Sequence, residues 1–263
     1  MHTRHPFTTR IVLPAATSAL ILGAAACGDD DDDAATTDAP AATEAPADTT
    51  APPADVGPFC DAFVSAVEAS FTEDPAVMGP AFEAATATAP AEIEPAVQTI
   101  IELPDDDPAF GPAYGEVLAF VESNCDYTEL NVTTKEYLFE GLPREVAAGP
   151  SIITMDNQGA EFHEVLLFKV NEGVTDTAID LLQLPDEEMG SKMSFAGVTM
   201  GPPGEPSKGV ANLTPGRYIA VCFLPQGATP EVMAQMDGPD SSLPEGAGPP
   251  HFMAGMVQEF NVA

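Results

Sequence analysis

Four side chains in the second half of the sequence belong to the types that bind transition metals in proteins. They are two histidines, a cysteine and a methionine, in the order His163, Cys222, His251 and Met256. Imidazole nitrogen, thiolate and thioether sulfur suit soft and borderline metals. The residue types and their order therefore predict a metal site.

The order of these residues resembles that of the cupredoxins, and of plastocyanin in particular. In that family an Asn-containing turn precedes the first histidine ligand, and a Pro-Gly turn leads into the strand that ends in the cysteine ligand. A Pro-His-x4-Met-Val segment then supplies the second histidine and the methionine. The matching segments here are 156–159 (Asp-Asn-Gln-Gly), 213–216 (Leu-Thr-Pro-Gly) and 250–257 (Pro-His-Phe-Met-Ala-Gly-Met-Val). The resemblance spans roughly Leu138 to Val262.

The resemblance implies one copper ion of the type-1 kind. His163, Cys222 and His251 would be its equatorial ligands and Met256 its axial ligand, with Met253 as the nearest rival for the axial place. Two imidazoles and a thiolate in one plane, with a long thioether bond, suit both oxidation states of copper. The implied function is transfer of single electrons through an exposed edge of His251.

The sequence departs from the family pattern between the second and third ligands. In the family a tight loop joins the cysteine to the second histidine, whereas 28 residues, 223–250, lie between Cys222 and His251. The entropic cost of closing a loop grows slowly with its length, so an insertion can leave its ends close together. The alternative hypothesis is a copper-free, cupredoxin-like surface module that binds a partner through the loop 223–250.

Two further readings of these side chains stay open. The domain is rich in methionine, and thioethers suit Cu(I), so the protein could carry Cu(I) on its surface. Cys222 and His251 could also form a nucleophile–base pair, but no orienting group or oxyanion motif accompanies them. Because P-loop, dinucleotide-binding, GxSxG and HExxH patterns are absent from the sequence, we do not expect an enzyme.

The second half of the chain has the residue pattern of β-strands joined by turns. Runs of β-branched and aromatic residues alternate with Gly, Pro and Asn, which predicts strands and turns. The expected strands are 137–139, 151–155, 164–170, 217–223 and 256–262, and short helical insertions are expected over 175–184 and 229–236. We expect residues 128–263 to form an all-β, cupredoxin-like Greek-key sandwich with helical insertions.

The region 58–127 has helical periodicity instead. Apolar residues recur every three or four positions, and Asp-Pro pairs at 74–75 and 107–108 are typical helix starts. A small helical bundle has a modest core and usually needs a covalent link. Cys60 and Cys125 flank the helical region, so we expect a disulfide between them. The fold class is thus α+β, in two domains, and Cys222 is left unpaired.

The N-terminus has the pattern of an export signal. Basic residues precede an apolar run that ends in small residues before Cys27, as in bacterial lipoprotein signals, where the cysteine is lipidated. We expect a signal peptide over 1–26 and a lipid on Cys27. Residues 27–57 are rich in Ala, Thr, Pro and acids, which predicts a disordered tether. The protein would be exported and anchored to the outer face of the bacterial cytoplasmic membrane.

The charge of the chain restricts its partners. The sequence has 42 acidic and 8 basic residues, a net charge of −34. Nucleic-acid binding needs a basic surface, so nucleic acid is excluded as a partner. Besides the membrane reached through Cys27, we expect a basic redox protein, such as a cytochrome, because opposite charges steer association.

Overall fold

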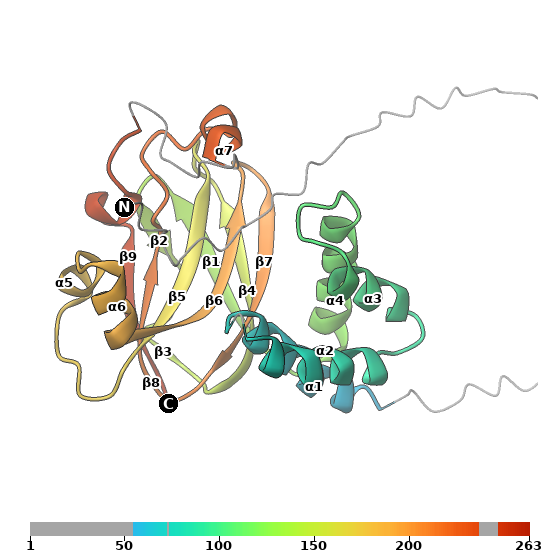
Figure 1. Ribbon diagram of the computed structural model, residues 1–263. Coiled ribbons are helices and arrows are strands. Elements are labelled where there is room, and N and C mark those ends of the chain that lie inside the picture. Colours follow the sequence, from blue (N-terminus) through green and yellow to red (C-terminus); the bar gives the residue numbers. More distant parts are fainter. Residues whose placement is uncertain (1–54, 73, 237–246) are drawn as a thin grey trace, which may run out of the picture. The chain divides into compact units, whose positions relative to one another are not determined.

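The computed structural model describes residues 55–72, 74–236 and 247–263 (Figure 1). The expected signal peptide, Cys27 and nearly all of the tether lie outside these residues, so they stay predictions. In the described part, no helix is long and apolar enough to cross a membrane.

The first part of the described chain is helical, as the periodicity predicts. Asp74 accepts a hydrogen bond from the backbone N–H of Ala76 and caps the second helix, which starts at Pro75. A disulfide joins Cys60 to Cys125, which confirms the expected pairing. The helices are α1 Gly57–Ser70, α2 Pro75–Thr88, α3 Glu94–Glu102 and α4 Phe110–Asn124.

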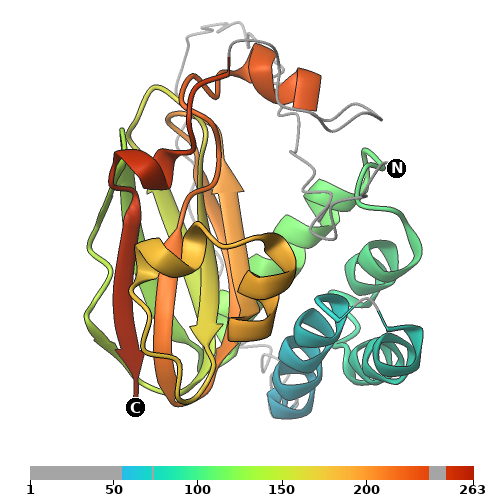
Figure 2. The ribbon, with the colours of Figure 1, turned by 60° about the vertical axis from the view of Figure 1, so that its left-hand side comes forward.

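Two sheets follow the helices and face each other across a common core (Figure 2). The four-stranded sheet has the order β2-β1-β4-β7, and the five-stranded sheet has the order β3-β9-β8-β5-β6. The pairs β1–β4 and β3–β9 are parallel, and the other pairs are antiparallel. The strands are β1 Thr128–Lys135, β2 Leu138–Glu140, β3 Glu145–Val146, β4 Gly149–Asn157, β5 His163–Val170, β6 Met193–Gly201, β7 Pro206–Leu213, β8 Gly216–Val221 and β9 Val257–Val262.

Side chains that point inward and outward alternate along the strands, which separates the core from the outer faces of the sheets. Leu130 and Ile153 of the first sheet meet Leu167, Ala220 and further residues of the second in one buried cluster. Three short helices, α5 Ala178–Leu182, α6 Asp186–Lys192 and α7 Pro230–Met236, interrupt the strands, and a 3-10 turn, η1 His251–Ala254, precedes β9. Of these, α5 and α6 cover the outer face of the five-stranded sheet.

The sequence prediction of this half was incomplete. The five expected strands and both helical insertions are present, with ends shifted by a few residues. The sequence did not predict five further elements, β1, β3, β6, β7 and α6.

Contacts also cross the expected domain boundary: Val210 of β7 packs in the core of the helices, and Lys208 pairs with Glu122. The Greek-key topology and the division into two domains stay predictions.

Candidate metal centre

The structure brings three of the four predicted ligands together at one end of the sandwich. Nδ1 of His163 lies 3.2 Å from Nδ1 of His251, which lies 3.3 Å from Sγ of Cys222. The donor atoms of all three residues lie within 4.8 Å of one another. All three side chains are fully buried.

This spacing fits a metal ion. Bonds of roughly 2.0–2.3 Å to nitrogen and sulfur place the donors of a trigonal site roughly 3.5–4 Å apart. The two closest pairs, at 3.2 and 3.3 Å, need to open by only a few tenths of an ångström. Two nitrogens and one sulfur in such a group form the His2Cys set typical of mononuclear copper sites.

His163 is placed by the turn that precedes β5. The buried amide of Asn157 donates hydrogen bonds to the carbonyls of Glu161 and Gly201, and its oxygen accepts one from Gly159. A Cβ atom at Gly159 would lie 2.7 Å from Nε2 of His163, so the turn needs glycine there. The turn 156–159 therefore leads into β5 and helps to place His163.

Cys222 and His251 are placed by hydrogen bonds between their own segments. The backbone N–H of Phe252 donates to the carbonyl of Cys222 at 3.0 Å, and that of His251 donates to the carbonyl of Leu224 at 2.8 Å. Further along, Pro225 and Pro250 form an isolated β-bridge. The ends of the insertion 223–250 are thus paired with each other, and the added length leaves Cys222 and His251 adjacent.

Met256 is buried and is hydrogen-bonded through its backbone to both His251 and Cys222, but its ligand role stays a prediction. Its backbone N–H donates to the carbonyl of His251, and its carbonyl accepts from the N–H of Cys222, each at 3.2 Å. The side chain belongs to the same buried cluster as Cys222. The rival, Met253, is 59% exposed, which favours Met256 for the axial place.

Burial controls the protonation of the cluster. It raises the pKa of the Cys222 thiol far above the ordinary value, and the nearby charge of Glu164 adds to the effect. Burial, followed by the charge of His251, lowers the pKa of His163 to about 4. The metal-free cluster is therefore neutral near pH 7, and a metal ion must displace the thiol proton. A buried, protonated thiol is also a poor nucleophile, which argues against the nucleophile–base reading.

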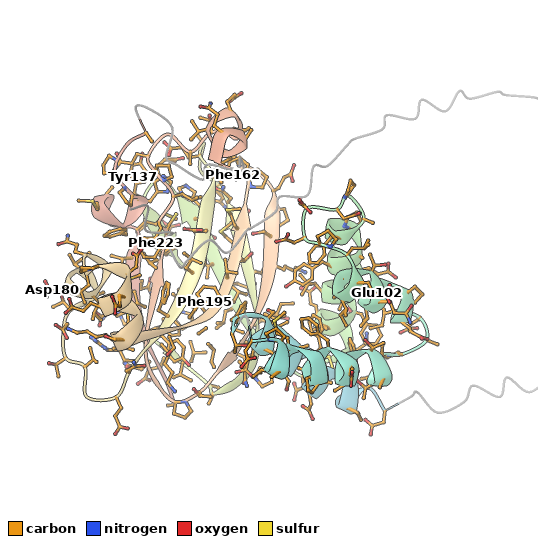
Figure 3. All side chains as sticks on the ribbon, viewed as in Figure 1. Glu102, Tyr137, Phe162, Asp180, Phe195 and Phe223 are labelled. Carbon is orange, nitrogen blue, oxygen red and sulfur yellow. A yellow bond between two sulfur atoms is a disulfide. The ribbon has the colours of Figure 1, made fainter. Side chains whose placement is uncertain are left out.

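The solvent exposure of His251 differs from the expectation. The sequence resemblance implied an exposed edge, but the side chain of His251 is fully buried. Its Nε2 atom lies 3.0 Å from Oε2 of Glu161, and the ring of Tyr137 lies over it at a centroid distance of 4.8 Å. Tyr137 is labelled at this end of the sandwich in Figure 3. The expectation of an exposed His251 was wrong because these two residues cover it.

Sequence reasoning also missed the carboxylates beside the ligands. Glu161 precedes His163 by two positions, Glu164 follows it directly, and Glu136 lies 4.0 Å from its Nε2. Glu164 is 4% exposed, and it accepts a hydrogen bond from the backbone N–H of Phe223. In a chain with 42 acidic residues no local pattern distinguishes Glu136 or Glu161. Only Glu164 is set apart by the sequence, because it is an acidic residue in a strand of mostly apolar residues.

Comparisons with known proteins add structural likenesses only. No protein-family model and no curated protein matches the sequence. Among solved structures, dithionite-reduced auracyanin from Roseiflexus castenholzii is 18% identical, with a TM-score of 0.31, and 52% of this chain and 97% of that chain are covered. Auracyanin A from Chloroflexus aurantiacus, described as a blue copper protein, is 17% identical, with a TM-score of 0.29 and coverage of 52% and 98%. A multi-copper oxidase from Pediococcus acidilactici is 8% identical, with a TM-score of 0.27 and coverage of 53% and 27%. At these identities and TM-scores the comparisons assign no family and no activity.

Proposed function

We propose that this protein is an exported, cupredoxin-like protein that binds one copper ion and transfers single electrons. The observation that carries the proposal is the convergence of the buried donors of His163, Cys222 and His251. Copper bound by two imidazoles and a thiolate would supply a one-electron couple between Cu(I) and Cu(II).

The scaffold supports this function by holding the donors in one arrangement. The segments of Cys222 and His251 are hydrogen-bonded to each other, and His163 pairs with Gly201 of β6. The cluster lies at the end of a sandwich with a continuous apolar core. Side chains in such close-packed interiors move little. A ligand set that does not rearrange lets an electron enter and leave with little reorganisation. Met256 is proposed as the fourth, axial ligand.

The covered His251 changes where a partner would make contact. Tyr137 is half-buried, and its ring packs on the ring of His251. We infer that electrons exchange through the Tyr137 side of the site and not through a bare edge of His251. The partner is proposed to be a basic redox protein, such as a cytochrome, because the net charge of −34 would steer it by attraction.

Attachment to the membrane through a lipid on Cys27 is part of the proposal. It is supported by the sequence pattern before Cys27. Expression in a bacterial host with radioactive palmitate should label the wild-type protein and leave Cys27→Ser unlabelled. Label that persists in Cys27→Ser, or none in either protein, would reject lipidation at this residue.

Titration with Cu(II), followed by visible absorption and EPR, tests the copper site. We expect an intense blue thiolate band and a narrow copper hyperfine splitting at one equivalent, and neither signal in Cys222→Ser. A matched control is Met253→Leu, which changes an exposed sulfur and should keep both signals. Colourless binding, or binding that Cys222→Ser does not affect, would reject electron transfer through a type-1-like site. The copper-free module that binds through the loop 223–250 would then replace it.

A further inference from the structure

The buried His251 has a second partner besides the predicted metal. Its Nε2 atom lies 3.0 Å from Oε2 of Glu161, whose side chain is 18% exposed. A carboxylate can only accept a hydrogen bond, so Nε2 carries the proton and Nδ1 presents its lone pair. That lone pair faces the cluster, with Sγ of Cys222 and Nδ1 of His163 at 3.3 and 3.2 Å.

Glu161 is itself fixed by segments far apart in the sequence. Its Oε2 accepts hydrogen bonds from the backbone N–H groups of Gly227 and Ala228, at 2.7 and 3.3 Å. Its Oε1 accepts one from the hydroxyl of Tyr137 at 3.2 Å, and its backbone carbonyl accepts one from the amide of Asn157 at 2.9 Å. The carboxylate therefore cannot turn away from His251 without breaking several contacts.

Tyr137 gives an independent sign that this arrangement is constrained. Its backbone lies in the left-handed region, with φ of 59°, which is uncommon for a bulky residue and costs energy. Such strain persists where the surroundings determine the conformation, and it is frequent at functional sites. In this conformation the ring contacts His251 while the hydroxyl donates to Glu161.

We propose that Glu161 is a positioning residue for the copper ligand His251. It fixes the imidazole as the Nε2–H tautomer with Nδ1 toward the donors, and its negative charge favours the more positive oxidation state of the bound ion. A carboxylate that accepts from the remote nitrogen of a ligand histidine orients the ring and makes it a stronger donor. This inference rests on the proposed copper function.

A charge effect can be separated from a structural one with Glu161→Gln in the full chain. The glutamine oxygen can still accept from Tyr137, Gly227 or Ala228, so a merely structural role would be largely retained. We expect the variant to bind Cu(II) about tenfold more weakly or worse, with Cu(I) affinity less affected. A selective tenfold loss corresponds to a reduction potential about 59 mV higher. Glu140→Gln, which removes an exposed carboxylate paired with Lys135, is the control and should change neither quantity.

The tautomer of His251 in the copper-free wild-type protein is a second readout that needs no variant. Nitrogen-15 NMR of the imidazole should show the proton on Nε2. An Nδ1–H tautomer would overturn the proposal, and so would a Glu161→Gln variant with unchanged Cu(II) affinity and potential. If the wild-type protein forms no copper–thiolate band, the proposed function fails, and the tautomer alone decides whether Glu161 positions His251.

Discussion

The thiol Sγ of Cys222 and the imidazole Nδ1 of His251 lie 3.3 Å apart, although the two residues are 29 positions apart in the sequence. Backbone hydrogen bonds from His251 to Leu224 and from Phe252 to Cys222 hold the end of the insertion next to its beginning. A long insertion between two ligands is therefore compatible with a closed donor cluster. Four predictions follow from this cluster and from the scaffold around it.

The variant Met256→Leu should still bind copper, but the reduction potential of the bound copper should change. Leucine has a similar volume, so the free energy of unfolding should change by less than about 1.5 kcal/mol. Loss of an axial sulfur removes a weak donor, and the reduction potential should rise while the blue thiolate band remains. The measurement is spectroelectrochemistry of Met256→Leu against Met253→Leu, which changes an exposed residue. If Met253→Leu shifts the potential and Met256→Leu does not, the axial assignment is reversed.

Glu164→Gln should stabilise the copper-free protein at alkaline pH. Burial raises the pKa of Glu164 from 4.5 to about 7, so the folded state holds this proton more tightly than the unfolded chain does. The stability contributed by this carboxyl group is full below pH 4.5 and is lost as the pH rises through about 7.

At pH 8, Glu164→Gln should therefore be more stable than the wild type by at most about 3 kcal/mol. The two proteins should differ little at pH 4.5, because the neutral amide can still accept from Phe223. Urea unfolding at both pH values, with Glu140→Gln as the control, checks the sign. A variant equally destabilised at both pH values would show that the charged carboxylate is well tolerated.

Loss of the disulfide should lower the stability of the helical region substantially. The bond joins residues 65 positions apart, and the loss of its constraint on the unfolded chain amounts to about 4 kcal/mol. Urea unfolding of Cys60→Ser/Cys125→Ser measures the effect. Tyr127→Phe is a useful comparison, because it removes only the hydrogen bond to the carbonyl of Cys60 and should cost about 1 kcal/mol. An equal loss in the free energy of unfolding in the two variants would show that the disulfide contributes no more than one hydrogen bond.

Two glycine substitutions should have opposite effects. A Cβ atom at Gly209 of β7 would lie 1.9 Å from the carbonyl oxygen of Val198 in β6, so Gly209→Ala should destabilise the sandwich by about 3 kcal/mol or more. Gly115, on the exposed side of α4, has nothing within 4 Å of such an atom. Gly115→Ala should stabilise the protein by about 1 kcal/mol through helix propensity. Thermal unfolding of both variants tests whether β6 and β7 approach as closely as described.

The elements that the sequence predicted best are those with strong local signals. The pair Asp74-Pro75 caps a helix in the expected way, and the apolar run over 164–170 becomes β5. By contrast, β7 contains Pro206, Lys208 and Gly209, which weaken any strand pattern. Its place is determined by pairing with β4 along eight residues, which is a tertiary effect that no local window contains.

The metal site shows the same division. The order of His163, Cys222 and His251 predicted the donor set because each lies beside a recognisable turn or strand. Tyr137 and Glu161 could not be predicted as the cover of His251, since they approach it from a hairpin and a turn far away in the sequence. Motif reasoning could therefore find the three residues that cluster, but not the residues that surround them.

The paired ends of the insertion after Cys222 have a consequence for how this protein can change over time. Gln226 and Pro249 share a backbone hydrogen bond, and Gly248 donates back to Gln226, so the two arms meet before the segment between them begins. Closing a loop of twice the length would cost only about 0.6 kcal/mol more. Exposed positions beyond this junction, such as Glu231 and Gln235, can thus be exchanged at little cost to the donor cluster. Gly227 and Ala228, which donate to Glu161, and the buried Met233 are constrained. Exchange at such exposed positions would leave the spacing of the donor atoms of His163, Cys222 and His251 unchanged.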